Sequence, residues 1–187
     1  GPENVIVLGG DHIYTMDYSK MLYVHAASGA DLTVGCIEVP REEAKEFGVM
    51  SVDEDYQITK FTEKPKKPQT VPGKDDTSLA SMGIYIFSTA YLYASLIADA
   101  EDPDSDHDFG KNIIPNSIKT CNARAYPFLN DDGTPAYWRD VGTVDSYWTA
   151  NMELCEVEPE LNLYSRAWPI WTYQTQHPPA KFIFDDE

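Results

Sequence analysis

Positive charge is scarce in this chain of 187 residues: Lys and Arg number 14 against 31 Asp and Glu, which leaves a formal net charge of −17. Nucleic acids and anionic membranes are bound mainly through Lys and Arg, so this balance argues against both kinds of partner. A phosphorylated substrate is still compatible with it, because a small anion needs only one or two placed cations or a metal held by carboxylates.

Cysteine and long apolar runs are equally scarce. The three cysteines are widely spaced and fit neither a disulfide framework nor a zinc pattern (Cys36, Cys121 and Cys155). No apolar run approaches the roughly 18–20 residues of a membrane span, and the first residues lack the basic and apolar regions of a signal peptide. A GxxxxGK phosphate loop and a Ser/His/Asp nucleophile signature are also lacking. We therefore expect a cytoplasmic protein without a nucleophile of that kind.

Apolar strands alternate with amphipathic helices along the chain. Val5–Leu8 predicts a buried strand, Asp17 and Gly29 bound a helix, and Asp31–Val39 predicts the next strand. A strand, helix and strand with short joins form a βαβ unit, so these two strands should be parallel. Further strands are predicted at 49–52, 57–61, 79–87, 124–129 and 136–139, and further helices at 40–46, 88–98, 109–118 and 143–156. The pattern predicts an α/β fold, a three-layer α/β/α sandwich with a mixed, mostly parallel sheet.

The last predicted helix carries one apolar stripe, Val144, Trp148, Met152 and Cys155. We expect the aromatic residues in and after it to serve in packing and interfaces rather than as a platform for stacking bases. His25, His107 and His177 are scattered, and we expect them to be structural or exposed.

Two acidic residues follow predicted strands and have glycines close by. Asp11 comes after Gly9-Gly10, and Asp140 is followed by Val141-Gly142. Open α/β sheets bind ligands at the carboxyl ends of their strands, and Mg²⁺ is usually held by one or two carboxylates together with substrate phosphates. A magnesium site is one interpretation, and simple capping of the turns that follow is the other. We expect His12 to pack or to support the acidic pair rather than to bind the metal.

A second polar group follows the predicted strand at 57–61. Glu63 can accept two sugar hydroxyls and Lys64 can meet a phosphate as a point charge, although a solvated ion pair is the alternative. Ser81 and Gly83 interrupt a buried strand, which indicates either close approach of a ligand or a β-bulge. Gly48 is open to the same interpretation, with a helix C-cap as the alternative.

These segments, taken in order, resemble the catalytic domain of bacterial glucose-1-phosphate adenylyltransferase (ADP-glucose pyrophosphorylase). The resemblance extends along nearly the whole chain. Its segments are Val7–Tyr14, Glu46–Met50, Phe61–Pro65, Ala80–Tyr85, His107–Lys111, Tyr137–Thr143, Pro159-Glu160, Trp168–Ile170 and Pro178–Phe182. It implies a Rossmann-like nucleotide-diphospho-sugar transferase fold that is incomplete at its N-terminus.

The family's reaction joins ATP and α-D-glucose 1-phosphate into ADP-glucose and pyrophosphate for glycogen synthesis. The resemblance implies Asp11 and Asp140 as Mg²⁺ ligands and Lys64 as the residue that holds the sugar phosphate; these three form the catalytic set. It further implies Glu63, Gly48 and Ser81 as glucose 1-phosphate contacts. The attack is in line on the α-phosphorus of ATP, and catalysis is mostly positioning and charge neutralisation.

The sequence departs from the family pattern at both ends. The glycine-rich loop for the ATP phosphates and the C-terminal β-helix domain are not among these 187 residues. We therefore expect residues 1–165 to be part of a catalytic domain and 166–187 to be a linker. We expect the chain to be inactive alone, to associate through an uncovered sheet edge, and to derive from a homotetrameric parent. Two alternatives are another sugar-1-phosphate nucleotidyltransferase, using dTTP, UTP or GTP, and a non-catalytic regulatory subunit of the same fold.

Overall fold

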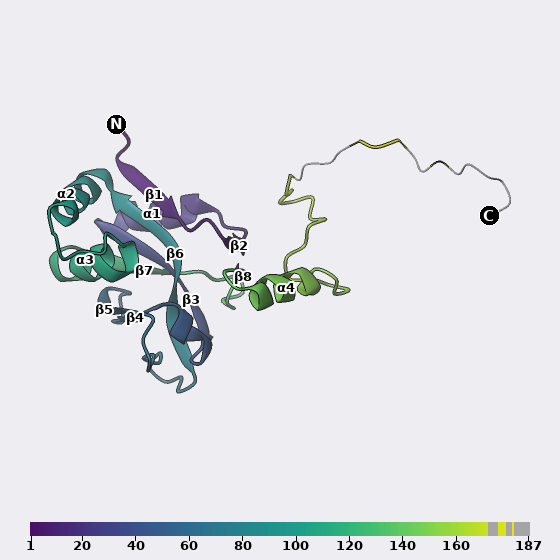
Figure 1. Ribbon diagram of the computed structural model, residues 1–187, viewed down its shortest axis with the longest axis horizontal. Coiled ribbons are helices and arrows are strands. Elements are labelled where there is room, and N and C mark those ends of the chain that lie inside the picture. The colour runs from purple at the N-terminus through teal and green to yellow at the C-terminus, as the bar shows by residue number, and fades with distance from the viewer. Residues whose placement is uncertain (172–175, 179–180, 182–187) are drawn as a thin grey trace.

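The longest strand, β6, organises the main sheet of the computed structural model, which describes residues 1–171, 176–178 and 181. One edge of β6 pairs with β3, and the other pairs with β4 along one part and with β1 along another. The sheet order is β5-β4-β6-β3-β7, with β1 attached to β6 beside this path (Figure 1). The strands are β1 (Asn4–Leu8), β3 (Leu32–Pro40), β4 (Gly48–Val52), β5 (Ile58–Glu63), β6 (Thr77–Ser88) and β7 (Ala123–Pro127).

The predicted mostly parallel sheet is wrong. Among the strand pairs of the described sheet, β3 and β7 pair in parallel and the other pairs are antiparallel. The predicted βαβ unit has the right strand directions, because β1 and β3 both run antiparallel to β6. However, β6 lies between them, since a helical crossover determines the direction in which a strand returns but not which strand becomes its neighbour.

Helices cover both faces of this sheet, so the predicted three layers are confirmed. One hydrophobic cluster joins Met21 of α1 (Tyr18–Ser28) to Ile84 and Ile86 of β6. The other joins Phe87 to Leu92 and Ile114 on the opposite face, where three further helical segments pack. Those helices are α2 (Thr89–Ala100), the π-helical turn η2 (Phe109–Ile113) and α3 (Ile114–Thr120).

The predicted first helix is confirmed at both ends. Asp17 caps α1 by accepting a hydrogen bond from the Ser19 backbone N–H at 3.0 Å, and Gly29 ends it with φ 60°. Buried His25 has its Nδ1 2.8 Å from Thr33 Oγ1, which ties α1 to β3. Burial lowers the pKa of His25, so this expected structural histidine is neutral near pH 7.

A separate two-stranded sheet lies between the main sheet and the last helix (Figure 1). It pairs β2 (His12–Tyr14) with β8 (Trp138–Asp140) in antiparallel register, so the strand predicted at 136–139 does not join the main sheet. The short β2 was not predicted, because three half-buried residues give no clear alternation.

The last helix, α4 (Val144–Glu153), begins at the predicted cap. Thr143 and Ser146 form a reciprocal capping box, but the helix ends at Glu153 rather than near Glu156. All four residues of the predicted apolar stripe, Val144, Trp148, Met152 and Cys155, are exposed, so the stripe does not pack against the described part of the chain. The reason is that the small sheet holds α4 by other contacts: Arg139 Nε and Nη2 of β8 donate to the Glu153 carboxylate at 2.9–3.1 Å.

Two further boundaries differ from the sequence expectation. The helix predicted at 40–46 is a single 3₁₀ turn, η1 (Glu43–Glu46), because Pro40 still belongs to β3. The described residues of the predicted linker 166–187 contain no helix or strand, and much of this linker lies outside the described residues. None of the described helices combines the length and the apolarity that crossing a bilayer requires.

Candidate functional site

The structure brings Asp11 and Asp140 together although they are 129 positions apart in the sequence. Asp11 lies in the turn between β1 and β2, and Asp140 ends β8 opposite His12 in the register of the small sheet. One ligand atom from each of these three residues lies within 4.8 Å of the others. The Val141 backbone N–H donates to the Asp11 carbonyl at 3.3 Å, which fixes the two turns against each other. The predicted juxtaposition of the two carboxylates is therefore confirmed.

The donor set of this cluster fits a hard divalent cation. Two carboxylates supply oxygen ligands, and the Asp11 side chain is 63% exposed, which leaves room for water or phosphate oxygens. A Cβ on Gly142 would lie 3.0 Å from Asp140 Oδ1 and 3.6 Å from Asp11 Oδ2, so the glycine keeps this space free. Asp140 also accepts a hydrogen bond from the Gly142 N–H at 2.8 Å. Turn capping, the alternative interpretation, therefore coexists with a carboxylate pair open to a cation.

Glu63 ends β5 directly opposite Gly48 in the register of the β4–β5 hairpin. A Cβ on Gly48 would lie 2.9 Å from Glu63 Oε2, and a Cβ on Gly110 would lie 2.5 Å from the same oxygen. Two glycines that are far apart in the sequence thus leave space for one carboxylate. Gly48 is the first residue of β4, so the helix C-cap alternative for it is wrong.

The surroundings of Glu63 favour its protonated form. Burial and, to a smaller extent, the nearby Asp108 carboxylate raise the pKa of Glu63, while Lys64 and Lys111 oppose this shift. Among the described residues no ion pair within 4.0 Å joins Glu63 to Lys64, so the solvated ion pair expected as the alternative is not formed. Within the described part of the chain the Glu63 carboxylate thus makes no direct salt bridge, and Gly48 and Gly110 leave it the space it occupies.

Lys64 has a left-handed backbone, with φ 41°, which is uncommon for a residue other than glycine. Its backbone N–H donates to the Phe47 carbonyl at 3.1 Å, and its side chain is exposed. The Phe47 ring packs at 5.2 Å against the ring of Trp138, which packs at 5.2 Å against His12 beside the acidic pair. These contacts connect the Lys64 backbone to the Asp11–Asp140 cluster.

Ser81 lies where β6 is bulged, which confirms the β-bulge interpretation. The pairing with β3 shifts between Val34 and Cys36, and Gly83 within the bulge has φ 67°. Ser81 Oγ accepts from the Gly83 N–H at 3.3 Å and lies 3.5 Å from Tyr85 Oη. Bulges often re-aim side chains next to active sites, so this result leaves a binding role for Ser81 open.

Sequence reasoning missed three residues near Glu63, namely Tyr85, Asp108 and Phe109. The rings of Tyr85 and Phe109 stack with their centroids 6.0 Å apart, and Asp108 caps the π-helical turn by accepting from the Lys111 N–H at 2.9 Å. Burial raises the pKa of Tyr85, which keeps its phenol protonated. The available signal was the resemblance itself, since Ala80–Tyr85 and His107–Lys111 are among its segments. The π-helical turn supports attention to this place, because such single turns are frequent at functional sites.

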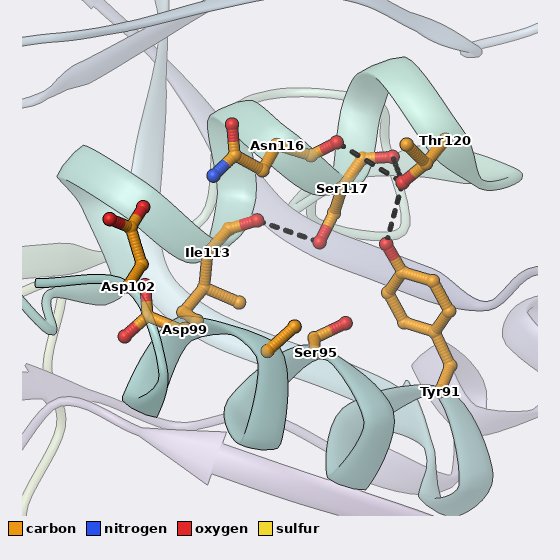
Figure 2. A pocket seen from close by; sticks show the side chains of 9 residues that line it. Tyr91, Ser95, Asp99, Asp102, Ile113, Asn116, Ser117 and Thr120 are labelled. Carbon is orange, nitrogen blue, oxygen red and sulfur yellow. Dashed lines mark hydrogen bonds between the residues drawn. The ribbon is translucent and has the colours of Figure 1, made fainter. Parts of the chain in front are cut away.

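Two hollows elsewhere in the molecule do not contain the predicted site residues. One of ≈ 330 Å³ lies between α2 and α3. Figure 2 shows the hydrogen bonds at its wall, between Tyr91 Oη and Thr120 Oγ1 and from Ser117 Oγ to the Ile113 carbonyl. Another of ≈ 670 Å³ lies beside the tip of the β4–β5 hairpin. Asp11 and Lys64 of the candidate site lie just after β1 and β5, Glu63 and Asp140 end β5 and β8, and Gly48 and Ser81 lie in β4 and β6.

Comparison with known proteins gives one consistent result. Residues 1–157 match the nucleotidyl transferase family. The chain is 65% identical over 186 residues to the glucose-1-phosphate adenylyltransferase of Hydrogenovibrio crunogenus and 61% identical over 186 residues to that of Thiobacillus denitrificans. It is 59% identical over 188 residues to that of Nitrosococcus oceani. Each alignment covers 100% of this chain but 44%, 42% and 44% of the respective relative, so the chain spans less than half of their length.

Proposed function

Since this chain belongs to the nucleotidyl transferase family, we propose that the full-length protein transfers the adenylyl group of ATP to α-D-glucose 1-phosphate. The products are ADP-glucose and pyrophosphate, which places the reaction in carbohydrate storage. The observation that carries this proposal is the meeting of Asp11 and Asp140, a cluster that the packed rings of His12, Trp138 and Phe47 connect to the Lys64 backbone. The names of the relatives support the choice of substrates.

Asp11 and Asp140 would hold one Mg²⁺. Two carboxylates with an open side match how proteins usually bind this ion, which keeps several waters and substrate phosphate oxygens. When bound, Mg²⁺ neutralises phosphate charge that develops during transfer. The role of these two residues is to place the cation beside the turn that carries Lys64.

Lys64, Glu63, Gly48 and Ser81 would form the sugar-phosphate half of the site. Lys64 would meet the phosphate of the sugar, and its left-handed backbone supports this role because strained residues cluster at functional sites. The space that Gly48 leaves beside Glu63 supports contact with sugar hydroxyls. A phosphate oxygen of the sugar then attacks the α-phosphorus of ATP, the new P–O bond forms, and the bond to pyrophosphate breaks. Positioning and charge stabilisation suffice for this reaction, so no protein nucleophile is needed.

The test uses the full-length protein with Mg²⁺ and measures pyrophosphate release and the sugar nucleotide formed. We expect ADP-glucose from ATP and glucose 1-phosphate, with neither substrate giving product alone. Efficient product formation from dTTP, UTP or GTP in place of ATP would favour another sugar-1-phosphate nucleotidyltransferase. No product with any nucleotide would favour the non-catalytic subunit.

Domain organisation and assembly are part of the same proposal. Residues 1–165 would belong to the catalytic domain, residues 166–187 would link it to a further domain, and the full-length protein would be a homotetramer. Sedimentation of the full-length protein tests the tetramer directly.

A further inference from the structure

We infer that His12 is a positioning residue that is locked between two glycine backbones and holds the Asp11 carboxylate toward Asp140. This inference rests on the proposed cation site, and it assigns a role to a residue that would not itself bind Mg²⁺. Three independent features carry it: the shape of the slot around the ring, the place of each ring nitrogen, and the register of the small sheet.

The slot around the His12 ring has no room for a side chain on either wall. A Cβ on Gly9 would lie 2.7 Å from His12 Cε1 and 2.9 Å from Nδ1, and a Cβ on Gly83 would lie 2.7 Å from Cε1. The Gly9 N–H donates to the Gly83 carbonyl at 2.9 Å, so the two walls are bonded to each other. Trp138 meets the ring edge-on, with centroids 5.2 Å apart and planes at 72°. The ring is therefore confined on several sides.

The two ring nitrogens have different surroundings. His12 Nε2 lies 3.5 Å from Asp11 Oδ1, whereas Nδ1 is buried and has no hydrogen-bond partner among the described residues. A neutral imidazole carries one N–H donor, and placing it on Nε2 directs it to Asp11. Hydrogen bonds at catalytic sites are often long before substrate binds, so 3.5 Å is compatible with this role.

Packing alone does not account for an imidazole here. An apolar ring would fill the slot and would leave no buried nitrogen without a partner. His12 also lies directly opposite Asp140 across the β2–β8 pair, and residues opposite each other in an antiparallel pair project from the same face. The ring thus lies beside both carboxylates. Asp140 accepts a hydrogen bond from the Gly142 N–H, whereas the Asp11 carboxylate has no backbone donor among the described hydrogen bonds, and Asp11 is the one that His12 contacts.

The first experiment measures Mn²⁺ binding to the full-length protein by the electron paramagnetic resonance signal of the free ion. His12→Phe keeps a ring in the slot but removes the donor, and we expect Mn²⁺ to bind about 10–100-fold more weakly, as is usual when a partner of a ligating group is removed. His12→Gln restores an N–H at a similar reach, and we expect it to recover part of the affinity. Equal Mn²⁺ affinity in His12→Phe and wild type would overturn the proposal.

A second experiment uses the slot itself. Gly9→Ala would push the His12 ring away, so we expect it to weaken Mn²⁺ binding in the wild-type background. In a His12→Ala background the slot is empty, and Gly9→Ala should then cause no further loss. A loss of the same size in both backgrounds would show that Gly9 acts independently of His12 and would contradict the proposal.

Two controls separate this inference from the proposed function. Asp11→Asn and Asp140→Asn should abolish tight Mn²⁺ binding, and if they do not, the cation site and the role of His12 both fail. If they do but His12→Phe binds normally, only the positioning role fails. Pulsed electron paramagnetic resonance spectra of bound Mn²⁺ should show no coupling to a directly bonded His12 nitrogen. A nitrogen coupling that is present in wild type and lost in His12→Phe would make His12 a ligand and overturn the positioning role.

Discussion

Gly48→Ala should lower the free energy of unfolding, because the structure leaves no room for a side chain at this position. The new Cβ would overlap the tip of the Phe61 ring and lie 3.0 Å from Phe61 Cε1 and 2.9 Å from Glu63 Oε2. Carbon atoms in contact prefer about 3.5–4.0 Å, so the ring must move. Phe61 is buried in the hydrophobic cluster and cannot move freely. Overpacking of this kind costs about 1–3 kcal/mol of unfolding free energy.

The assay is thermal and urea unfolding of the 187-residue chain. A loss of 1 kcal/mol lowers Tm by about 2–4 °C in a chain of this size, so we expect Gly48→Ala to melt about 2–12 °C below wild type. Gly10→Ala is the matched control, because a Cβ there meets nothing within 4 Å. Its Tm should stay within about 2 °C of wild type.

The double variant with Phe61→Leu decides whether the clash is the cause. A shorter side chain at position 61 makes room for the new methyl group, so the double variant should lose less stability than the two single variants added together. Strictly additive losses, or a Gly48→Ala variant as stable as Gly10→Ala, would refute the reasoning.

Three further predictions concern Glu63, Lys64 and the sheet edge. Below the ordinary Glu pKa of 4.5, Glu63 is protonated in both the folded and the unfolded protein. Because its pKa is raised in the folded protein, stability is lost as pH rises through that folded pKa and the carboxyl ionises. Glu63→Gln should therefore be about as stable as wild type in acid and more stable near neutral pH, as pH-dependent urea unfolding would reveal; a constant difference at all pH values would contradict this. In the full-length protein, Lys64→Ala should weaken glucose 1-phosphate by roughly 10–150-fold and ATP much less, because a charged hydrogen bond contributes about 1.5–3 kcal/mol. Equal losses for both substrates in steady-state kinetics would instead assign Lys64 to the fold. Ile6 is 37% exposed on β1, which pairs with β6 alone among the described strands, so the 187-residue chain should self-associate there and Ile6→Lys should keep it monomeric in sedimentation.

Local signals in the sequence were sufficient for much of the fold. Asp17 and Gly29 marked both ends of α1, because capping chemistry is local. The position of β6 at the centre of the sheet was not predictable in the same way. Its neighbours β1, β3 and β4 are all distant in sequence, and an apolar run identifies a buried strand without identifying its partners.

The candidate site was likewise predictable from the sequence only in part. Asp11 and Asp140 were singled out because each lies close to a glycine just after or at the end of a predicted strand, and the structure brings them together. However, the β2–β8 pair brings them together, whereas the prediction placed both at the carboxyl ends of strands of one sheet. The place of Gly110 beside Glu63 was not predictable, because two residues 47 positions apart carry no joint signal in one sequence.

The central claim is that one site holds both the cation and the sugar phosphate. The measurement is the ³¹P relaxation of glucose 1-phosphate bound to the full-length protein with Mn²⁺ and a non-reactive ATP analogue. Paramagnetic relaxation falls steeply with distance, so Mn²⁺ at Asp11 and Asp140 should strongly broaden the sugar phosphorus signal. Asp140→Asn should abolish that broadening. Broadening that is absent in wild type, or unchanged in Asp140→Asn, would contradict the account.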